Sequence, residues 1–305
     1  MIEPKSFIES LIGHGVNFFS GVPDSLLSSI CACIADSKKV THVVAANEGT
    51  AVSLAIGNYL SSGNLGAVYL QNSGLGNIVN PIVSLADAQV YKIPLLLIIG
   101  WTGEPGITDE PQHIKQGIIT ESQLDVLGIP YEILDADTDT LELIDSLMDR
   151  ISSSQAPGAI LVRKNTFSSY HAKSKKNQME VRASITREDA LFCLAGLIDE
   201  NSLVVSTTGK TSRELFEIRK QRGQDNNDFL TVGGMGHTSS IALGAALSNT
   251  SKDVVCIDGD GSMIMHMGSM ATIGTTGPNN FTHIIINNNA HDSVGGQITH
   301  AENID

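Results

Sequence analysis

One segment of the chain combines glycine, acidic and amide residues in an order that suits a magnesium-bound diphosphate. The run VVCID predicts a strand that ends at Gly259, Asp260, Gly261 and Ser262; a helix follows, and the next predicted strand ends near Asn288. In an open parallel sheet, ligands collect at the carboxyl ends of strands. Asp260 and Asn288 offer the hard oxygen atoms that Mg²⁺ prefers. The glycines let a diphosphate approach the backbone, and Ser262 can donate to it at the helix start.

The elements that must position this segment alternate between apolar runs and helical stretches. In the first half of the chain, the apolar runs predict strands at 16–20, 42–45, 67–71, 94–100, 131–134 and 159–163. Helices are expected at 5–14, 25–35, 49–60 and 140–152. This alternation favours parallel sheets with crossover helices, and the continuous run PLLLIIG is typical of a strand buried on both faces. The expected fold class is therefore α/β, with two doubly wound parallel-sheet domains.

A polar stretch without periodicity separates the two expected domains. We predict a first domain at 1–168, a linker at 169–184 and a second domain at 185–305. A helix is expected to open the second domain at Thr186, because Thr186 and Asp189 have the spacing of an N-terminal cap. Further strands are predicted at 203–206, 254–258 and 283–287, and a helix at 238–248. The chain ends soon after the last strand, so we expect a second domain that is C-terminally short.

Composition argues against several classes of protein. The formal net charge of −14 disfavours binding to nucleic acid or to an anionic membrane surface. No run reaches the roughly 18 apolar residues of a membrane span, and the first residues lack the pattern of a signal peptide. The four cysteines are scattered, without the spacing of a redox pair or a metal site. Free thiols and a cytoplasmic location are therefore expected.

The GDG sequence at Gly259, followed by paired asparagines at the next strand end, resembles the motif shared by thiamine-diphosphate-dependent decarboxylases, acetolactate synthases and transketolases. The resemblance implies thiamine diphosphate and Mg²⁺ as cofactors. It implies that Asp260 and Asn288 bind the ion by their side chains and Ala290 by its backbone carbonyl. Asn289 fills a place where relatives often have glycine. Asparagine is the least costly replacement there if the position needs a positive φ.

Two other segments resemble parts of the thiamine site. Glu48, between a predicted strand and a predicted helix, resembles the glutamate that bonds N1′ of the aminopyrimidine, where a dry pocket raises the pKa of the carboxyl group. Alone, it would be an ordinary helix-start carboxylate. GGMGH resembles the segment that bends the cofactor, with Met235 as the apolar wedge and the Gly233 carbonyl as acceptor for the 4′-amino group. Thr208 and Gly209 complete the expected cofactor set.

Further segments narrow the resemblance to phosphonopyruvate decarboxylases, with sulfopyruvate decarboxylases as near relatives. These segments are GVPDSLL, LQNSGLGNIVNP, DEPQHIKQG, TTGKTSRELF and NNNAHDSVGGQ. The implied reaction converts 3-phosphonopyruvate to phosphonoacetaldehyde and CO₂, a step of phosphonate biosynthesis. By the same resemblance, Asp24 is a candidate proton relay. His113 and His291 are the other acid–base candidates.

A substrate that carries a phosphonate and a carboxylate needs cations, which an acidic protein must supply locally. Lys210 and Arg213 follow a predicted strand and open a predicted helix, which favours an anion site. Lys115 is expected in the motif loop, and Asp109 on the surface of the same loop. Thr102 departs from the family pattern, which has arginine at that place.

Several interpretations remain open on the sequence alone. The substrate could be sulfopyruvate or another 2-oxo acid, and the short second domain and Thr102 would also suit an inactive cofactor-binding remnant. A nicotinamide dehydrogenase is disfavoured, because no GxGxxG opens a helix after the first strand. The resemblance implies a homodimer or higher homo-oligomer with sites between subunits, to which Glu48 and Asp260 contribute from different domains. We expect no nucleic-acid or membrane partner.

Overall fold

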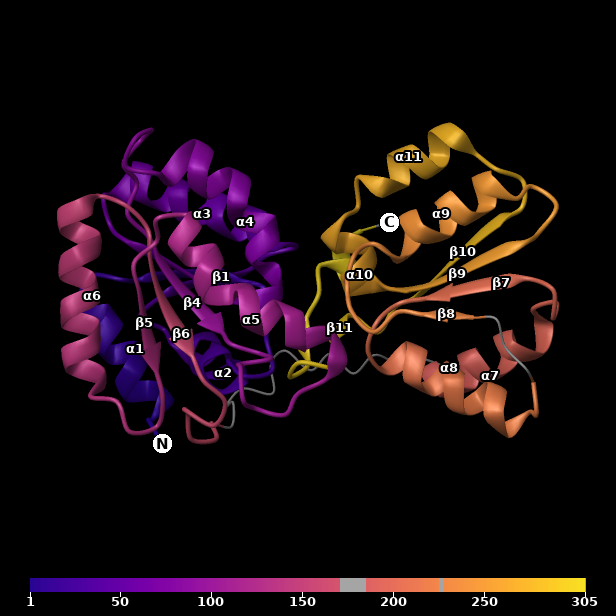
Figure 1. The fold of residues 1–305 in the computed structure, drawn as a ribbon, viewed down its shortest axis with the longest axis horizontal. Helices are drawn as coiled ribbons and strands as arrows, with labels where there is room; N and C mark the ends of the chain where they lie inside the picture. Colours follow the sequence, from indigo (N-terminus) through magenta and orange to yellow (C-terminus); the bar gives the residue numbers. More distant parts are fainter. Residues whose placement is uncertain (171–184, 225–227, 305) are drawn as a thin grey trace. The chain divides into compact units, whose positions relative to one another are not determined.

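The computed structural model describes residues 1–170, 185–224 and 228–304, and the chain divides into two compact units at 1–176 and 177–305 (Figure 1). The predicted linker at 169–184 lies almost wholly outside the described residues, so its limits stay a prediction. Within the described ranges, no helix is both long and apolar enough to cross a membrane.

The first unit is a six-stranded parallel sheet with helices on both faces, in the strand order β2-β1-β3-β4-β6-β5 (Figure 1). Its strands are β1 (Phe18–Gly21), β2 (Thr41–Val44), β3 (Gly66–Gln71), β4 (Leu96–Gly100), β5 (Tyr131–Leu134) and β6 (Gly158–Val162). Its helices are α1 (Pro4–Gly13), α2 (Ser28–Asp36), α3 (Glu48–Ser62), α4 (Leu75–Pro81), α5 (Pro111–Val126) and α6 (Thr140–Ser154), with the short turns η1 (Asn72–Gly74) and η2 (Ile82–Ala86).

Two apolar layers hold this sheet. One joins the sheet to α1, α2 and α6, and the other joins it to α3, α4 and α5. All five residues of β4 are buried, as the continuous apolar run predicts for a central strand. The strand order reverses direction between β1 and β3, and in open α/β sheets the crevice at such a reversal is the preferred ligand site.

The second unit is a smaller parallel sheet in the order β10-β9-β7-β8. Its elements are α7 (Arg187–Leu197), β7 (Leu203–Ser206), α8 (Lys210–Gln221), β8 (Phe229–Leu230), α9 (Thr238–Ser248), β9 (Val254–Gly259), α10 (Asp260–Met265), α11 (Ser269–Thr276) and β10 (Phe281–Ile286), followed by β11 (Ala290–His291), β12 (Gln297–Ile298) and η4 (Ala301–Asn303). The apolar side chains of α7 and α8 cover one face of the sheet and those of α9 cover the other.

The predicted strands are confirmed, with ends that differ by at most two residues. The predicted cap is also confirmed: Thr186 accepts from the backbone N–H of Asp189 at 3.1 Å. The prediction of a loop at DEPQHIKQG is wrong, because most of this segment forms α5. Lys115 lies exposed on that helix. Gly117 allows this helix to lie where it does, because a Cβ at that position would lie 1.7 Å from the Gly103 carbonyl oxygen. The helix can therefore pack directly on the loop after β4.

We expect Leu97→Ala to destabilise the first unit by about 2–5 kcal/mol, because Leu97 is fully buried in the layer that contains Trp101. Trp101 is the one tryptophan of the chain, so its fluorescence during denaturant unfolding follows this unit. Leu141→Ala is the matched control, since Leu141 is 64% exposed on α6. Equal shifts of the unfolding midpoint in both variants would contradict the assigned core.

Candidate functional site

A cavity in the second unit lies at the carboxyl ends of three neighbouring strands, where the strand order reverses between β7 and β9. Most residues predicted to hold the cofactor and the metal line it. They are Thr208, Met235, Gly259, Asp260, Gly261, Ser262, Asn288 and Ala290. The anion candidate Lys210 and the acid–base candidate His291 line it as well. Parallel register explains this convergence, because β7, β9 and β10 end side by side. The sequence spacing alone could not show that the segment after β7 joins the other two.

Asp260 begins α10 and is only 4% exposed. Its carboxylate accepts a hydrogen bond from the hydroxyl of Thr299 at 2.5 Å. A buried carboxylate needs such a donor or a cation, because its charge has lost its hydration. Thr299 therefore fixes one oxygen of Asp260, and sequence analysis missed this residue because no motif marks it.

The turn after β10 brings two more oxygen ligands to the same cavity. The Asn288 side chain accepts from the backbone N–H of Ala290 at 3.1 Å, which closes a local turn. Asn289 has a φ of 56°, so the prediction of a left-handed residue at this place is confirmed. The Asp260 carboxylate, the Asn288 amide and the Ala290 carbonyl form a donor set of hard oxygens, which suits Mg²⁺.

Gly261 leaves space for side chains that converge on the cavity. A Cβ at this position would lie 2.9 Å from the His291 ring and 3.4 Å from the Met235 methyl group. The backbone N–H of Gly236 donates to the Ser262 hydroxyl at 3.1 Å, which ties the GGMGH segment to the start of α10. Burial lowers the pKa of His291, so this ring is neutral at neutral pH. Gly233 is not among the lining residues.

The positive charges at the cavity are already paired. The Lys210 ammonium lies 2.8 Å from Asp292, which also accepts from Arg187 at 3.1 Å. Arg187 in turn donates to both oxygens of Glu214. These ion pairs lower the pKa of Asp292, with the hydrogen bond from Lys210 as the largest cause. Lys210 can therefore bind a substrate anion only if its ammonium group contacts Asp292 and the anion together, or if the anion replaces Asp292.

The other two predicted residues near α8 are placed differently. Gly209 caps the helix with a φ of 90°, a conformation that favours glycine, but it is not among the cavity-lining residues. Arg213 lies exposed on α8 and does not line the cavity either. The geometry therefore gives Lys210 the better position for an anion.

In the first unit, Glu48 is a buried carboxyl group at the start of α3, with 6% of its surface exposed. Asn47 caps the helix by accepting from the Thr50 N–H, which sets the first turn and hence the direction of Glu48. Asn77 on α4 donates to the carboxyl group at 2.7 Å. Burial raises the pKa of Glu48, although the bond from Asn77 opposes that shift.

Gly74 forms the wall against which the Glu48 carboxyl group packs. A Cβ at Gly74 would lie 2.4 Å from an oxygen of Glu48. The predicted motif LQNSGLGNIVNP thus contributes both the donor, Asn77, and the space beside the carboxyl group. The motif is recognisable in the sequence, but these two roles depend on the contact with Glu48 across the fold.

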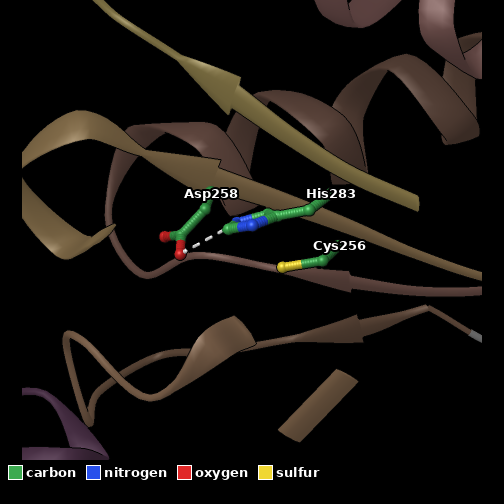
Figure 2. Close-up of side chains that lie close together, drawn as sticks. All are labelled: Cys256, Asp258 and His283. Carbon is green, nitrogen blue, oxygen red and sulfur yellow. Dashed lines mark ion pairs between the residues drawn. The ribbon is translucent and has the colours of Figure 1, made fainter. Parts of the chain in front are cut away.

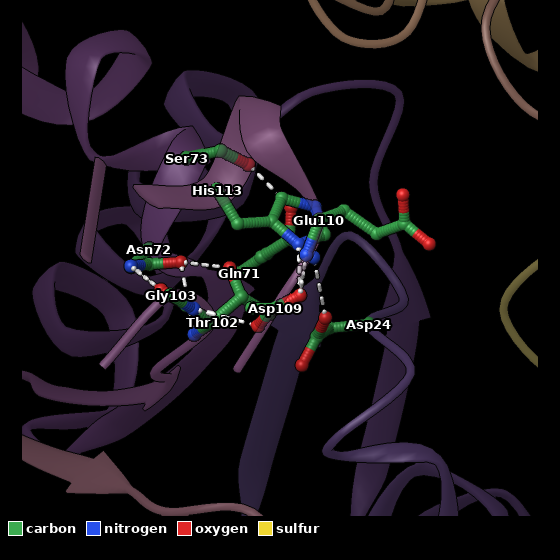
Figure 3. A network of polar contacts seen from close by, with 9 residues as sticks. All are labelled: Asp24, Gln71, Asn72, Ser73, Thr102, Gly103, Asp109, Glu110 and His113. Carbon is green, nitrogen blue, oxygen red and sulfur yellow. Dashed lines mark hydrogen bonds and ion pairs between the residues drawn. The ribbon is translucent and has the colours of Figure 1, made fainter. Parts of the chain in front are cut away.

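Asp24 lies between the ends of β1 and β3 and is 1% exposed. Figure 3 shows its carboxyl group at one end of a polar chain: Gln71 donates to Asp24 at 3.0 Å, and Ser73 donates to Gln71 at 2.6 Å. Burial raises the pKa of Asp24 to about 6, against the hydrogen bonds from Gln71 and from the Leu26 backbone. A carboxyl group in this range can give or take a proton near neutral pH.

His113 lies in the same polar region of the first unit (Figure 3). Its Nδ1 lies 2.7 Å from Asp109, which also accepts from the Gly103 N–H at 2.8 Å. Desolvation on its own would raise the pKa of Asp109. The hydrogen bonds that this carboxylate accepts, the one from His113 first, together outweigh desolvation and lower the pKa to about 2. The expectation of Asp109 as plain loop surface was therefore wrong: this carboxylate orients His113 and closes the loop before α5.

Thr102, where the resemblance implies arginine, faces inward. It is 4% exposed, and its hydroxyl donates to the Asn72 side chain at 2.6 Å. Asn72 in turn donates to the Thr102 carbonyl and to Thr120 on α5. This threonine therefore holds the end of β4 against η1 and offers no positive charge.

Comparisons with known proteins agree with this arrangement. The model of the thiamine pyrophosphate enzyme N-terminal TPP binding domain matches residues 5–124, and that of the C-terminal TPP binding domain matches residues 207–304. The first covers Glu48 and Asp24, and the second covers the residues that line the cavity of the second unit except Arg187.

Three relatives match nearly the full chain. Phosphonopyruvate decarboxylase of Streptomyces viridochromogenes is 34% identical over 320 residues, which cover 100% of this chain and 78% of the relative. The enzyme of the same name from Streptomyces hygroscopicus is 33% identical, with 100% and 77% covered. Sulfopyruvate decarboxylase of Methanosarcina acetivorans is 27% identical, with 97% and 78% covered.

We expect Gly74→Ala to weaken thiamine diphosphate binding, because the added methyl group must displace the Glu48 carboxyl group. Overpacking of this kind costs about 1–3 kcal/mol, which is about 5-fold to 150-fold in affinity if binding bears the whole cost. Gly76→Ala is the matched control: it adds the same methyl group two residues on, where nothing lies within 4 Å. Titration calorimetry with both variants makes the measurement, and equal affinities would refute the role of Gly74.

Asp24 makes the stability of the first unit depend on pH. Its folded pKa of about 6 lies above its ordinary value, so the folded chain holds a proton that the unfolded chain releases. Stability from this group is present below about pH 4 and is lost as pH rises through about 6, by about 3 kcal/mol in total. Asp24→Asn should remove that slope in denaturant unfolding measured between these limits. Asp149→Asn, at an exposed position of α6, should keep it.

Proposed function

Because this chain belongs to the thiamine-diphosphate-dependent decarboxylase family that includes the phosphonopyruvate decarboxylases, we propose that it converts 3-phosphonopyruvate to phosphonoacetaldehyde and CO₂ with the help of Mg²⁺. The chain is a thiamine-diphosphate-dependent decarboxylase of the phosphonopyruvate or sulfopyruvate type. The observation that carries the finer proposal is the convergence of Asp260, Asn288 and Ala290 on one glycine-walled cavity. The identity to full-length phosphonopyruvate decarboxylases supports the choice of substrate.

In this proposal, the second unit holds the diphosphate. Asp260, Asn288 and the Ala290 carbonyl bind Mg²⁺, which neutralises part of the diphosphate charge. Thr208 and Ser262 donate to the diphosphate oxygens at helix starts and strand ends. Met235 would pack against the bound cofactor from the cavity wall, where its methyl group lies beside Gly261.

In the first unit, Glu48 has the burial and the raised pKa that proton sharing with the aminopyrimidine ring requires. Asn77 and Gly74 keep its carboxyl group in place, and the donor Asn77 is a neutral amide. The cofactor itself supplies a thiazolium ring that accepts the electron pair left when CO₂ departs.

Asp24, His113 and His291 are the groups that we propose for proton transfer to the product carbon. Asp24 has a pKa of about 6, and Gln71 fixes the direction of its carboxyl group. His113 is oriented by Asp109, and His291 is a neutral ring at the cavity of the second unit. A neutral imidazole can accept a proton, and a carboxyl group with a raised pKa can donate one.

The phosphonate needs a cation, and Lys210 is the candidate that lines the cavity. Arg213 and Lys115 lie exposed on α8 and α5 and remain weaker candidates. The second candidate substrate is sulfopyruvate, favoured by the full-length match to a sulfopyruvate decarboxylase. The two acids differ in charge, because a phosphonate carries up to two negative charges and a sulfonate one.

The decisive experiment measures CO₂ release from 3-phosphonopyruvate, sulfopyruvate and pyruvate by the full chain with thiamine diphosphate and Mg²⁺. We expect 3-phosphonopyruvate to have the highest kcat/KM. Glu48→Gln should lower kcat by about 10²–10⁴-fold, because the amide keeps the shape but cannot share a proton. Chelation of Mg²⁺ should abolish turnover, and Asp260→Asn should raise the Mg²⁺ concentration that restores it.

Glu142→Gln, at an exposed position of α6, is the matched control and should keep full turnover. Faster turnover of sulfopyruvate would assign the alternative substrate. A thermal shift with cofactor but no turnover of any acid would indicate a cofactor-binding remnant. Light scattering of the same preparation tests the proposed homodimer or higher homo-oligomer, which a monomeric active enzyme would contradict.

A further inference from the structure

Three side chains with metal-binding chemistry gather on one face of the second sheet (Figure 2). They are Cys256 and Asp258 on β9 and His283 on β10, and their ligand atoms all lie within 4.8 Å of one another. None of them lines the cavity described above. Within the described part of the chain, this is the one group of three or more such residues with that spacing.

The parallel register of β9 and β10 explains why these residues meet. Cys256 and His283 are direct neighbours across the two strands. Asp258 follows Cys256 by two residues, so its side chain points to the same face of the sheet. Cys256 packs with Ala242 and Ala246, two small residues of α9.

Two of the ligand atoms are buried without a hydrogen-bond partner. They are Oδ2 of Asp258 and Nε2 of His283. Oδ1 of Asp258 is occupied, because it accepts from the Gly259 N–H at 2.9 Å. Asp258 is 1% exposed, so an unsatisfied oxygen there is costly unless something binds it.

The distance between these two atoms fits a shared metal ion better than a hydrogen bond. Oδ2 of Asp258 lies 3.5 Å from Nε2 of His283. Charge-assisted N–H···O bonds are about 2.7–2.9 Å long. Two ligands on a tetrahedral zinc ion, each about 2.0–2.2 Å from the metal, lie about 3.3–3.5 Å apart. The observed separation of 3.5 Å matches the distance between two ligand atoms of such a tetrahedral site.

We propose that Cys256, Asp258 and His283 bind one zinc ion, with water in the fourth position. The thiol and the imidazole exclude Mg²⁺ and Ca²⁺, which prefer oxygen ligands only, and a mixed sulfur, nitrogen and oxygen set suits Zn²⁺. The thiol proton passes to solvent when the sulfur binds the metal. The His283 side chain is 12% exposed, which gives the ion a path to the site.

The site would join β9 to β10 just before Gly259 and Asp260. It would therefore stiffen the strand end that carries the proposed Mg²⁺ ligand, without taking part in the chemistry. The zinc proposal rests on side chains outside the cofactor cavity, so it does not depend on the proposed decarboxylation. A chain that is inactive towards every 2-oxo acid would still bind zinc.

The test uses the full chain with thiamine diphosphate and excess Mg²⁺, stripped of transition metals by a chelator and then supplied with Zn²⁺. We expect one tightly held zinc per chain by elemental analysis after dialysis. Cys256→Ser and His283→Gln should each lose it. Cys193→Ser is the matched control, since Cys193 is an exposed free thiol on α7, and it should retain the zinc. Asp260→Asn should also retain it, which separates this site from the Mg²⁺ site.

Co²⁺ provides a readout that does not depend on the folding of any variant. Substitution of Co²⁺ into the wild-type chain should give the visible bands of a tetrahedral ion and a thiolate-to-cobalt charge-transfer band. Bound cobalt without the thiolate band would overturn the proposal, because Cys256 would not be a ligand. Absence of zinc uptake by the wild-type chain, or full retention of zinc by Cys256→Ser, would also overturn it and leave a simple contact between Asp258 and His283.

Discussion

Burial of carboxyl groups at the ends of parallel strands is the constraint around which both units are built. Among the described residues, the buried acidic side chains are Asp24, Glu48, Asp258 and Asp260. Three of them receive a hydrogen bond from a neutral side chain: Gln71, Asn77 or Thr299. A neutral donor compensates part of the desolvation cost, whereas a neighbouring cation would hold the group ionised. Burial therefore raises the pKa values of Asp24 and Glu48, and the bonds from Gln71 and Asn77 oppose that shift without reversing it, so both groups keep the raised pKa that proton transfer needs.

Three cations of the second unit, two of them beside the cavity, are paired with carboxylates. Arg219 pairs with Asp228 in the interior, and Arg187 and Lys210 meet at Asp292 beside the cavity. In a chain with a formal net charge of −14, this leaves little positive charge to neutralise a diphosphate. A metal ion supplies that charge at a fixed point without the entropy cost of ordering a long side chain. In the proposed site, such an ion would let Asp260 be buried close to an anionic ligand.

Much of the fold could be predicted from the sequence, because apolar periodicity is a local signal. The buried run of β4 and the cap at Thr186 followed from neighbouring residues alone, whereas the left-handed Asn289 was expected from the glycine that relatives often have there. The pattern failed at α5, since its contact with the loop after β4 depends on the absence of a side chain at Gly117. Such a contact joins distant positions and leaves no trace in hydrophobic periodicity.

The candidate site likewise has residues that could be predicted from the sequence and residues that could not. Motif spacing located Asp260 and Asn288, and the family resemblance located Glu48, but neither could reveal the residues that hold them. Thr299 is 39 positions away from Asp260, and only the turn through β11 and β12 brings the two together. The charge of Lys210 was predictable and its pairing with Asp292 was not, because that pairing joins positions 82 apart in the chain.

Trp101 is buried at the end of β4, where its indole N–H donates to the Gly117 carbonyl at 3.1 Å. It is the sole tryptophan of the chain, and it belongs to the first unit. Of the four cysteines, Cys193 alone is exposed, and it lies in the second unit. The native sequence therefore has a buried energy-transfer donor, Trp101, in one unit and one exposed thiol for an acceptor dye, Cys193, in the other. An acceptor dye attached to that thiol would report how the separation of the two units responds to cofactor and substrate, with no residue altered.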